Sequence, residues 1–320
     1  MNQFWVWLSQ LKGVGPATQR RLLTTLGAPE AVYHATMQQL LQTPAVTEAH
    51  AALIRKQRSL APALRILQQC RELGLSVIPL TGCDYPSPIQ EAHDAPIVLY
   101  AEGPPLPAEG VAVLGHAPPS EAATDIMRRA VVHLKKQAVP VLGSLDQSLA
   151  QDALETCRRL NGTFAATVAG GPDCQPPYIR QSIEQLRGAG SIVYLHPPGT
   201  TIRRCHFAQQ DVVLAAWATC GLVPEPVPDA DALATARAFV HQDRPLYAAP
   251  HTLTDVLNHP NPSEPCFPAC NCSSQAFEGA HLYLSPDQLS PTFDSRDDGR
   301  VLFVGDLDST FIERVGEEVL

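Results

Sequence analysis

Short apolar runs alternate with helical stretches from residue 110 onward, and this alternation constrains the fold more than any other feature. The runs VAVLG, VPVLG, TFAATVAGG, SIVYL, GLVPEP and PLYAAP have the length and composition of buried strands. Helical segments separate them, and Ser120 is a candidate N-cap for the first. This spacing predicts an α/β fold, a Rossmann-like doubly wound parallel sheet, whose ligands would bind at the carboxyl ends of the strands.

The first 74 residues have a different pattern. Leucines and tryptophans recur at helical spacing, and Gly27 with Pro29 marks one helix end while Gly74 marks another. We expect four regions: a small helical helix-hairpin-helix domain at residues 1–74, a connector with one strand at 75–105, a Rossmann-like domain at 106–290, and an acidic C-terminal tail at 291–320 with one strand and one helix.

A Gly-x-Gly-Pro turn in LKGVGPATQRRLL, residues 11–23, separates two helical stretches. Glycines permit a tight turn and close approach of a ligand to the backbone. The amides that open the second helix would then point at an anion, and a proline suits the first helical position. The alternative is a hairpin whose glycines serve packing alone. The predicted nucleic-acid-binding residues are Lys12, Gly13, Gly15, Arg20 and Arg21.

Charge is distributed unevenly along the chain. The formal net charge is -9, but residues 1–75 hold eight Lys and Arg against three Glu, a balance of +5 that leaves −14 for the remainder. A basic domain on an acidic body can meet a polyanion with one end only. Because no apolar run reaches the roughly 18 residues of a membrane span, and no signal-peptide layout is visible, we expect a cytoplasmic protein with no membrane contact.

The connector resembles a known family. LTGCDYPSPIQEAHDAPIVLYAEG, residues 80–103, is similar to the Tyr-Pro…Asp-x-Pro-x-x-Leu-x-x-x-Gly segment of the DNA-processing protein A (DprA/Smf) family. Three later segments resemble that family's pattern in order: SIVYLHPPGTTIRRCHFAQQDVVLAAWA, ADALATARAFVHQDRPLYAAPH and FEGAHLYLSPDQL. The resemblance covers about residues 4–290. The matching connector residues are Tyr85, Pro86, Asp94, Pro96, Leu99 and Gly103.

The resemblance implies a helical domain joined to a Rossmann-like domain, and with it a function. It implies a protein that binds and protects incoming single-stranded DNA and helps to load a RecA-type recombinase in natural transformation and recombination. It also implies a homodimer that acts without catalysis. The residues themselves show no Ser/His/Asp order, metal-carboxylate set or Walker-type loop, so we expect no catalytic residue, no cofactor and no metal.

The sequence departs from the family where the family contacts DNA. Its Gly-[Ser/Thr]-Arg is Gly115-His116-Ala117 here, and its glycine-rich loop is shortened to residues 143–146. Its Arg-Asn-Arg is Gln210-Asp211-Val212 here. We expect residues 209–212 to face the DNA groove, where the loss of arginines removes bidentate phosphate donors. Two alternatives stay open: a diverged paralogue that is a scaffold or partner subunit without DNA binding, and a nucleotide-binding Rossmann-like protein.

Small and polar residues at the predicted strand ends are candidates for a pocket, unless the glycines serve turns and the polar groups cap helices. They are Gly115, Ser120, Gly143, Ser144, Asp146, Gly170, Gly171, His206 and Thr235. A second group, Cys266, Cys270 and Cys272, forms C-x3-C-x-C. Thiolates suit zinc, but the usual C-x2-C pairs are missing, which favours loop cysteines without metal.

Overall fold

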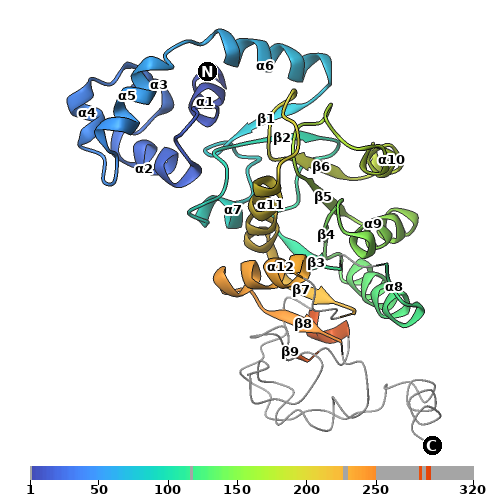
Figure 1. The fold of residues 1–320 in the computed structure, drawn as a ribbon. Helices are drawn as coiled ribbons and strands as arrows, with labels where there is room; N and C mark the ends of the chain where they lie inside the picture. Colours follow the sequence, from blue (N-terminus) through green and yellow to red (C-terminus); the bar gives the residue numbers. More distant parts are fainter. Residues whose placement is uncertain (1, 116–117, 226–229, 250–280, 283–285, 290–320) are drawn as a thin grey trace, which may run out of the picture.

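The computed structural model describes residues 2–115, 118–225, 230–249, 281–282 and 286–289. A cluster of helices lies beside a larger α/β unit, and the chain enters the α/β unit only after the sixth helix (Figure 1). The strand and helix expected in residues 291–320 lie outside the described residues, as does the cysteine cluster.

The first part of the chain is helical, as predicted. Threonine hydroxyls cap two of its helices: Thr36 accepts from the Gln39 amide and Thr47 from the His50 amide. Gly27 ends the second helix with a φ of 84°, which favours glycine. The helices are α1 (Asn2–Ser9), α2 (Pro16–Leu26), α3 (Pro29–His34), α4 (Met37–Leu41), α5 (Glu48–Lys56) and α6 (Ala61–Glu72).

The described strands form a sheet in the order β1-β2-β6-β5-β4-β3-β7-β8-β9. Neighbours from β6 to β9 pair in parallel, whereas β1 and β2 are antiparallel additions at one edge. The predicted α/β sheet is therefore confirmed. The strands are β1 (Ser76–Pro79), β2 (Val98–Glu102), β3 (Gly110–Val113), β4 (Val141–Ser144), β5 (Phe164–Val168), β6 (Ser191–Tyr194), β7 (Ala218–Val223), β8 (Leu246–Ala248) and β9 (His281–Leu282).

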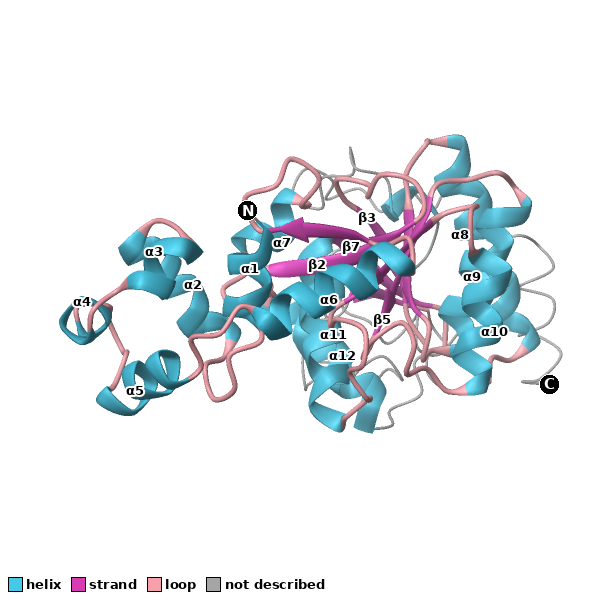
Figure 2. Ribbon diagram, turned by 90° about the horizontal axis from the view of Figure 1, so that it is seen from above, coloured by secondary structure: helices cyan, strands magenta, loops and turns pink. Residues whose placement is uncertain are grey.

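Helices cover both faces of this sheet (Figures 1 and 2). α8 (Glu121–Lys136), α9 (Ser148–Arg159) and α10 (Pro177–Leu186) pack on one face, and α11 (Arg204–Trp217) and α12 (Ala230–His241) pack on the other. The strand order reverses beside β3, because α11 carries the chain from β6 back to β7. The ends of β3 and β7 therefore form the switch point where such folds bind ligands.

The connector contributes more structure than its prolines indicated. One strand was predicted there, but β2 is a second, and it extends the sheet by pairing antiparallel to β6. The run IVLY before Ala101 is buried, which outweighs the proline that precedes it. A short helix, α7 (Ser87–Glu91), follows β1 and precedes β2 in the sequence. α1 and α6 lie against this edge of the sheet (Figure 2).

Candidate nucleic-acid interface

The Gly-x-Gly-Pro turn joins α1 to α2, and its two glycines serve different purposes. Gly13 has a φ of 81°, and a Cβ there would lie 3.0 Å from Leu53 Cδ1, so both the backbone and the packing require glycine. Gly15 is the N-cap of α2, with a φ of −75° and no side-chain cap. A Cβ at Gly15 would have no neighbour within 4 Å. The start of α2 therefore has no side-chain cap, and the first-turn amides of Ala17 and Thr18 have no acceptor within the helix.

A glutamine after α5 holds this turn rigid. The Lys12 N–H donates to Gln57 Oε1 and Gln57 Nε2 donates to the Lys12 carbonyl, each at 3.0 Å. The Trp7 indole N–H donates to the Gln57 carbonyl at 2.9 Å. From inside, buried Gln19 donates to the Val14 carbonyl at 2.8 Å. The Lys12 peptide groups are thus fully engaged, while its side chain is exposed.

The predicted cations of the hairpin separate into two kinds. Lys12 and Arg21 are exposed. Arg20 instead turns toward the connector, where its guanidinium donates to three carbonyls at 2.9, 2.7 and 3.2 Å. These belong to Ala95, Gln90 and Ile89. Burial lowers the pKa of Arg20. A phosphate role for Arg20 stays a prediction, and its geometry is that of a link between α2 and the connector.

The first turn of α9 fills the ends of β3 and β4. The Gly115 N–H donates to Gln147 Oε1 at 3.0 Å, and the Leu149 amide donates to the Gly115 carbonyl at 3.2 Å. A Cβ at Gly115 would lie 2.9 Å from Leu149 Cβ, and one at Gly143 would lie 3.1 Å from Ala150 Cβ. These two candidate pocket glycines therefore serve close packing of helix on strand.

The end of β5 is closed in the same way by residues 197–202. Gly170 has a φ of 80°, and a Cβ there would lie 2.7 Å from Ile202 Cγ1. The Gly171 amide donates to the Thr200 carbonyl at 2.8 Å. Both glycines are buried. Their lack of a side chain lets the two loops approach each other.

A buried polar network lies between these strand ends. Ser144 Oγ donates to Asp146 Oδ1 at 2.7 Å, and Gln210 Nε2 reaches Ser144 Oγ, Asp146 Oδ1 at 3.0 Å and the Thr167 carbonyl at 3.1 Å. Gln210 is only 1% exposed. The expectation that residues 209–212 face a groove is therefore wrong for Gln210, because this position lies on the sheet-facing side of α11.

The next residue of α11 also points inward. Thr235 Oγ1 on α12 donates to Asp211 Oδ1 at 2.9 Å. Burial raises the pKa of Asp211 to about 7, the Thr235 hydrogen bond opposes this shift, and Asp146 and Asp231 add to it. Thr235 and Asp146 from the predicted pocket thus meet around Asp211. The Asp211 carboxyl is therefore only partly ionised near neutral pH, and it forms a contact between α11 and α12.

The switch point holds a carboxylate of the protein itself. Ser120 caps α8 as predicted, since its hydroxyl accepts from the Ala123 amide at 3.1 Å. The Ser120 N–H donates to Glu225 Oε2 at 2.9 Å, from the residues that follow β7. An anion at a helix N-terminus is stabilised by the helix dipole. Glu225 therefore occupies the position that a phosphate would take here.

His206 packs as a hydrogen-bonded histidine. Its ring lies 3.9 Å, centroid to centroid, from that of His196, and its Nδ1 accepts from the Arg203 amide at 3.3 Å. Burial lowers the pKa of His206, and it lowers the pKa of His196 to about 4. Both rings are therefore neutral at physiological pH and contribute no charge to the strand ends.

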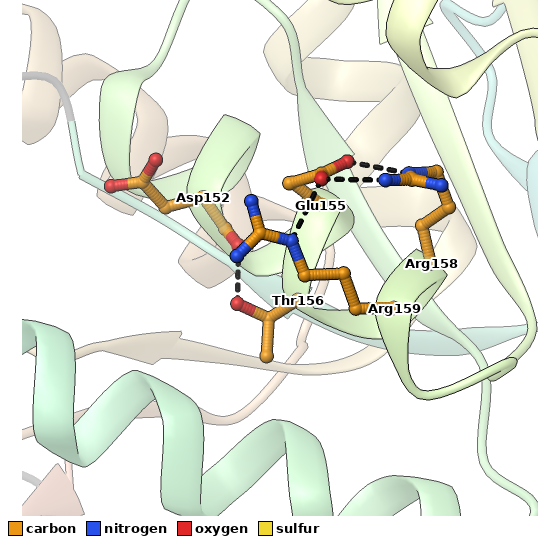
Figure 3. Close-up of polar contacts among 5 residues, drawn as sticks. All are labelled: Asp152, Glu155, Thr156, Arg158 and Arg159. Carbon is orange, nitrogen blue, oxygen red and sulfur yellow. Dashed lines mark hydrogen bonds and ion pairs between the residues drawn. The ribbon is translucent and has the colours of Figure 1, made fainter.

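Two arginines late in α9 are neutralised by a carboxylate. Glu155 pairs with Arg158 at 2.6 Å and with Arg159 at 2.9 Å (Figure 3). The hydrogen bond from Arg158 holds the pKa of Glu155 at about 2. By contrast, Arg203 and Arg204 at the start of α11 are exposed and form no ion pair with a described residue. The sequence prediction missed this pair, although RR precedes the Cys-His-Phe segment it used.

Among the residues that the structure describes, no helix combines the length and apolarity that a bilayer span requires. No group of three or more His, Cys, Asp or Glu side chains in the same ranges is arranged to hold a metal ion.

Comparisons with known proteins agree with this architecture. The family model for DNA recombination-mediator protein A matches residues 76–264. Protein Smf of Synechocystis is 27% identical over 293 residues, covering 89% of this chain and 71% of the relative. The DNA processing protein DprA of Bacillus subtilis is 22% identical, covering 68% of this chain and 75% of the relative.

Two solved structures share the fold. The X-ray structure of DNA processing protein A from Streptococcus pneumoniae has a TM-score of 0.71 at 16% identity and covers 92% of this chain and 99% of its own. The second is DNA processing protein A from Helicobacter pylori, whose single-stranded DNA binding mode has been described. It has a TM-score of 0.50 at 17% identity, and the match covers 56% of this chain and 82% of the Helicobacter pylori chain. Because the family model spans more than half of the sequence, the chain belongs to the DNA recombination-mediator protein A family.

Proposed function

We propose that this protein binds single-stranded DNA during DNA processing for recombination and passes it to a RecA-type recombinase. Membership of the family supports the process, and the Helicobacter pylori relative supports the ligand. The protein acts as a binding protein without catalysis, as a homodimer in the cytoplasm.

The DNA contact lies at the hairpin turn of the helical domain. The observation that carries this is the open start of α2: Gly15, which packing does not require, precedes first-turn amides that no side chain caps, and the nearby cations Lys12 and Arg21 are exposed. Arg21 lies on the same face as the first turn of α2, because residues three and four apart are neighbours on a helix. A phosphate seated at this turn would receive amide hydrogen bonds and two positive charges.

Contacts within the α/β unit favour a DNA contact in the helical domain instead. Gln210 and Asp211, at the first two positions of the family's Arg-Asn-Arg segment, bond inside the fold, and Glu225 occupies the start of α8. These contacts also favour the second candidate, a diverged paralogue that is a scaffold or partner subunit. The two candidates differ in whether the chain binds DNA at all.

A pair of double variants separates them. Lys12→Ala with Arg21→Ala should weaken binding to a single-stranded oligonucleotide and should make the plot of log K against log salt shallower by about 1.4, since each lost phosphate contact contributes about 0.7. Filter binding at several salt concentrations measures both quantities. Arg65→Ala with Arg71→Ala is the matched control, because it removes two exposed charges from α6, away from the turn.

A control that weakens binding as much as the test variant would mean that only net charge matters. If the wild-type protein binds no single-stranded DNA at low salt, the DNA-binding candidate is excluded and the scaffold or partner subunit is favoured. Unchanged binding by the test variant, in a protein that does bind, would move the contact to Arg203 and Arg204.

A further inference from the structure

The chain leaves the described part of the structure beside α8. The one-turn helix η2 (Pro286–Leu289) packs on α8, and Leu289 is 1% exposed in the same core cluster as Val131 of that helix. α8 has 16 residues, which makes it roughly 24 Å long. Eight or nine extended residues span about the same distance, so Asp297 and Asp298 can reach any position along α8 from Leu289.

A basic strip runs along the exposed side of α8. It consists of Arg128, Val132, Lys135 and Lys136, which are three and four residues apart and therefore share one helix face. All four are exposed, and Val132 places an apolar side chain among the cations. Lys135 and Lys136 are the only lysines of the chain after residue 75, in a portion that is otherwise strongly acidic.

The described part of the α/β unit supplies few carboxylates to this α8 strip. Asp125 is already paired with Arg129 at 2.9 Å. Burial raises the pKa of Asp152 on α9 and Arg128 opposes that shift, so Arg128 has a partial electrostatic partner. The two lysines of the strip form no ion pair with a described residue. The positive charge of the strip is therefore concentrated at the end of α8.

The segment from residue 291 to residue 320 has the complementary composition. It holds eight Asp and Glu against three Arg, a balance of −5, together with apolar runs such as VLFV. Its tether at Leu289 makes an encounter with α8 intramolecular, which raises the effective concentration of the segment at the strip. Chain continuity and charge therefore favour this segment over a separate molecule as the occupant.

We propose that residues 291–320 dock on the α8 strip of their own chain, through ion pairs with Lys135 and Lys136 and an apolar contact at Val132. α8 and the helical domain lie on opposite sides of the molecule (Figures 1 and 2). An acidic segment held at α8 does not compete with a polyanion for the cations of the helical domain. The docking goes beyond the proposed function and does not depend on DNA binding.

Carbodiimide crosslinking of the full chain, which joins lysine amines to nearby carboxylates, tests the docking. The chain has four lysines, Lys12, Lys56, Lys135 and Lys136, so mass spectrometry can assign each link. We expect links from Lys135 and Lys136 to residues 291–320. Lys56 is the matched control, because it is also exposed in the last turn of a helix. A mixture of isotope-labelled and unlabelled protein separates links within one chain from links between two.

Trypsin cleavage after Arg296 and Arg300 provides a second readout. Lys135→Glu with Lys136→Glu should speed this cleavage by about fivefold, which corresponds to about 1 kcal/mol for two exposed ion pairs. Lys135→Arg with Lys136→Arg should keep the wild-type rate. Arg55→Glu with Lys56→Glu is the control, because it reverses an adjacent pair at the end of α5. Circular dichroism checks that each variant is folded, since cations near a helix end also stabilise that helix.

Three results would overturn the proposal. Equal links from Lys56 and from the α8 lysines would mean that these lysines only stabilise the end of their helix. Links from the α8 lysines mainly to carboxylates outside residues 291–320 would assign the strip to another segment, and links only between two chains would assign it to a second copy. Cleavage at the wild-type rate in the folded Lys135→Glu and Lys136→Glu variant would also contradict the docking. Because neither experiment contains DNA, their outcome is independent of the proposed function.

Discussion

Changing Asp211 to Asn tests how the closed strand edge is held together. Burial raises the pKa of Asp211 to about 7, from an ordinary value of 3.8. A carboxyl that binds its proton more tightly in the folded chain than in the unfolded chain lowers the free energy of unfolding as pH rises between the two pKa values. The stability that this group contributes is therefore complete below about pH 4 and is lost progressively up to about pH 7.

The difference of about 3 pKa units sets the size of the effect. At about 1.36 kcal/mol per unit, the loss in the wild type reaches at most about 4 kcal/mol above pH 7. Asn has no charge to bury, and its Oδ1 can still accept the hydrogen bond from Thr235. The variant should match wild type near pH 4.5 and exceed it near pH 8, by up to about 4 kcal/mol.

Urea unfolding followed by circular dichroism at pH values of about 4.5, 6 and 8 measures this difference. Asp84→Asn is the control, because it removes a carboxylate from an exposed position of the connector. An Asn variant that is less stable than wild type at pH 8 would refute the reasoning, since it would mean that an ionised Asp211 stabilises the contact between α11 and α12.

Two further predictions concern the hairpin and its link to the connector. Arg20→Ala should lower the free energy of unfolding by at least about 1.5–3 kcal/mol in urea titrations, because three carbonyls lose a charged donor, and Arg20→Lys should recover only part of it. Gly13→Ala should cost about 1–2 kcal/mol from its positive φ, whereas Gly15→Ala should change stability by less than about 1 kcal/mol while weakening DNA binding. A Gly15 variant that binds DNA normally would leave this glycine without a role in binding.

The sheet could be predicted because its strands are short, apolar and separated by helices of regular length. That pattern can be recognised from neighbouring residues, because strands buried on both faces of a parallel sheet are nearly continuous apolar runs. β2 was missed because the prolines around it resemble a loop, although the run of four buried residues from Ile97 to Tyr100 carries the signal of a strand. Its pairing with β6 joins residues about 90 positions apart, which no local pattern reports.

The candidate site was predictable only in part, for the same reason. The turn at Gly13 and Gly15 is recognised from adjacent residues and the helix after it. Three contacts that decide the electrostatics arise from tertiary packing: Gln57 on the Lys12 peptide, Arg20 on the connector, and Gln210 inside the strand edge. Comparison with the family's sequence pattern shows that an arginine has been replaced at position 210. Only the fold shows that Gln210 is buried and bonded to Asp146.

Hydrogen exchange of the backbone amides in the presence and absence of a single-stranded oligonucleotide tests the central claim most directly. The account places phosphate at the open start of α2, where Ala17 and Thr18 have first-turn amides with no intrahelical acceptor. It predicts slower exchange in peptides that cover residues 12–19 when DNA is added, with little change at residues 143–148. Protection confined to the strand-end loops, with residues 12–19 unchanged at saturating DNA, would contradict it.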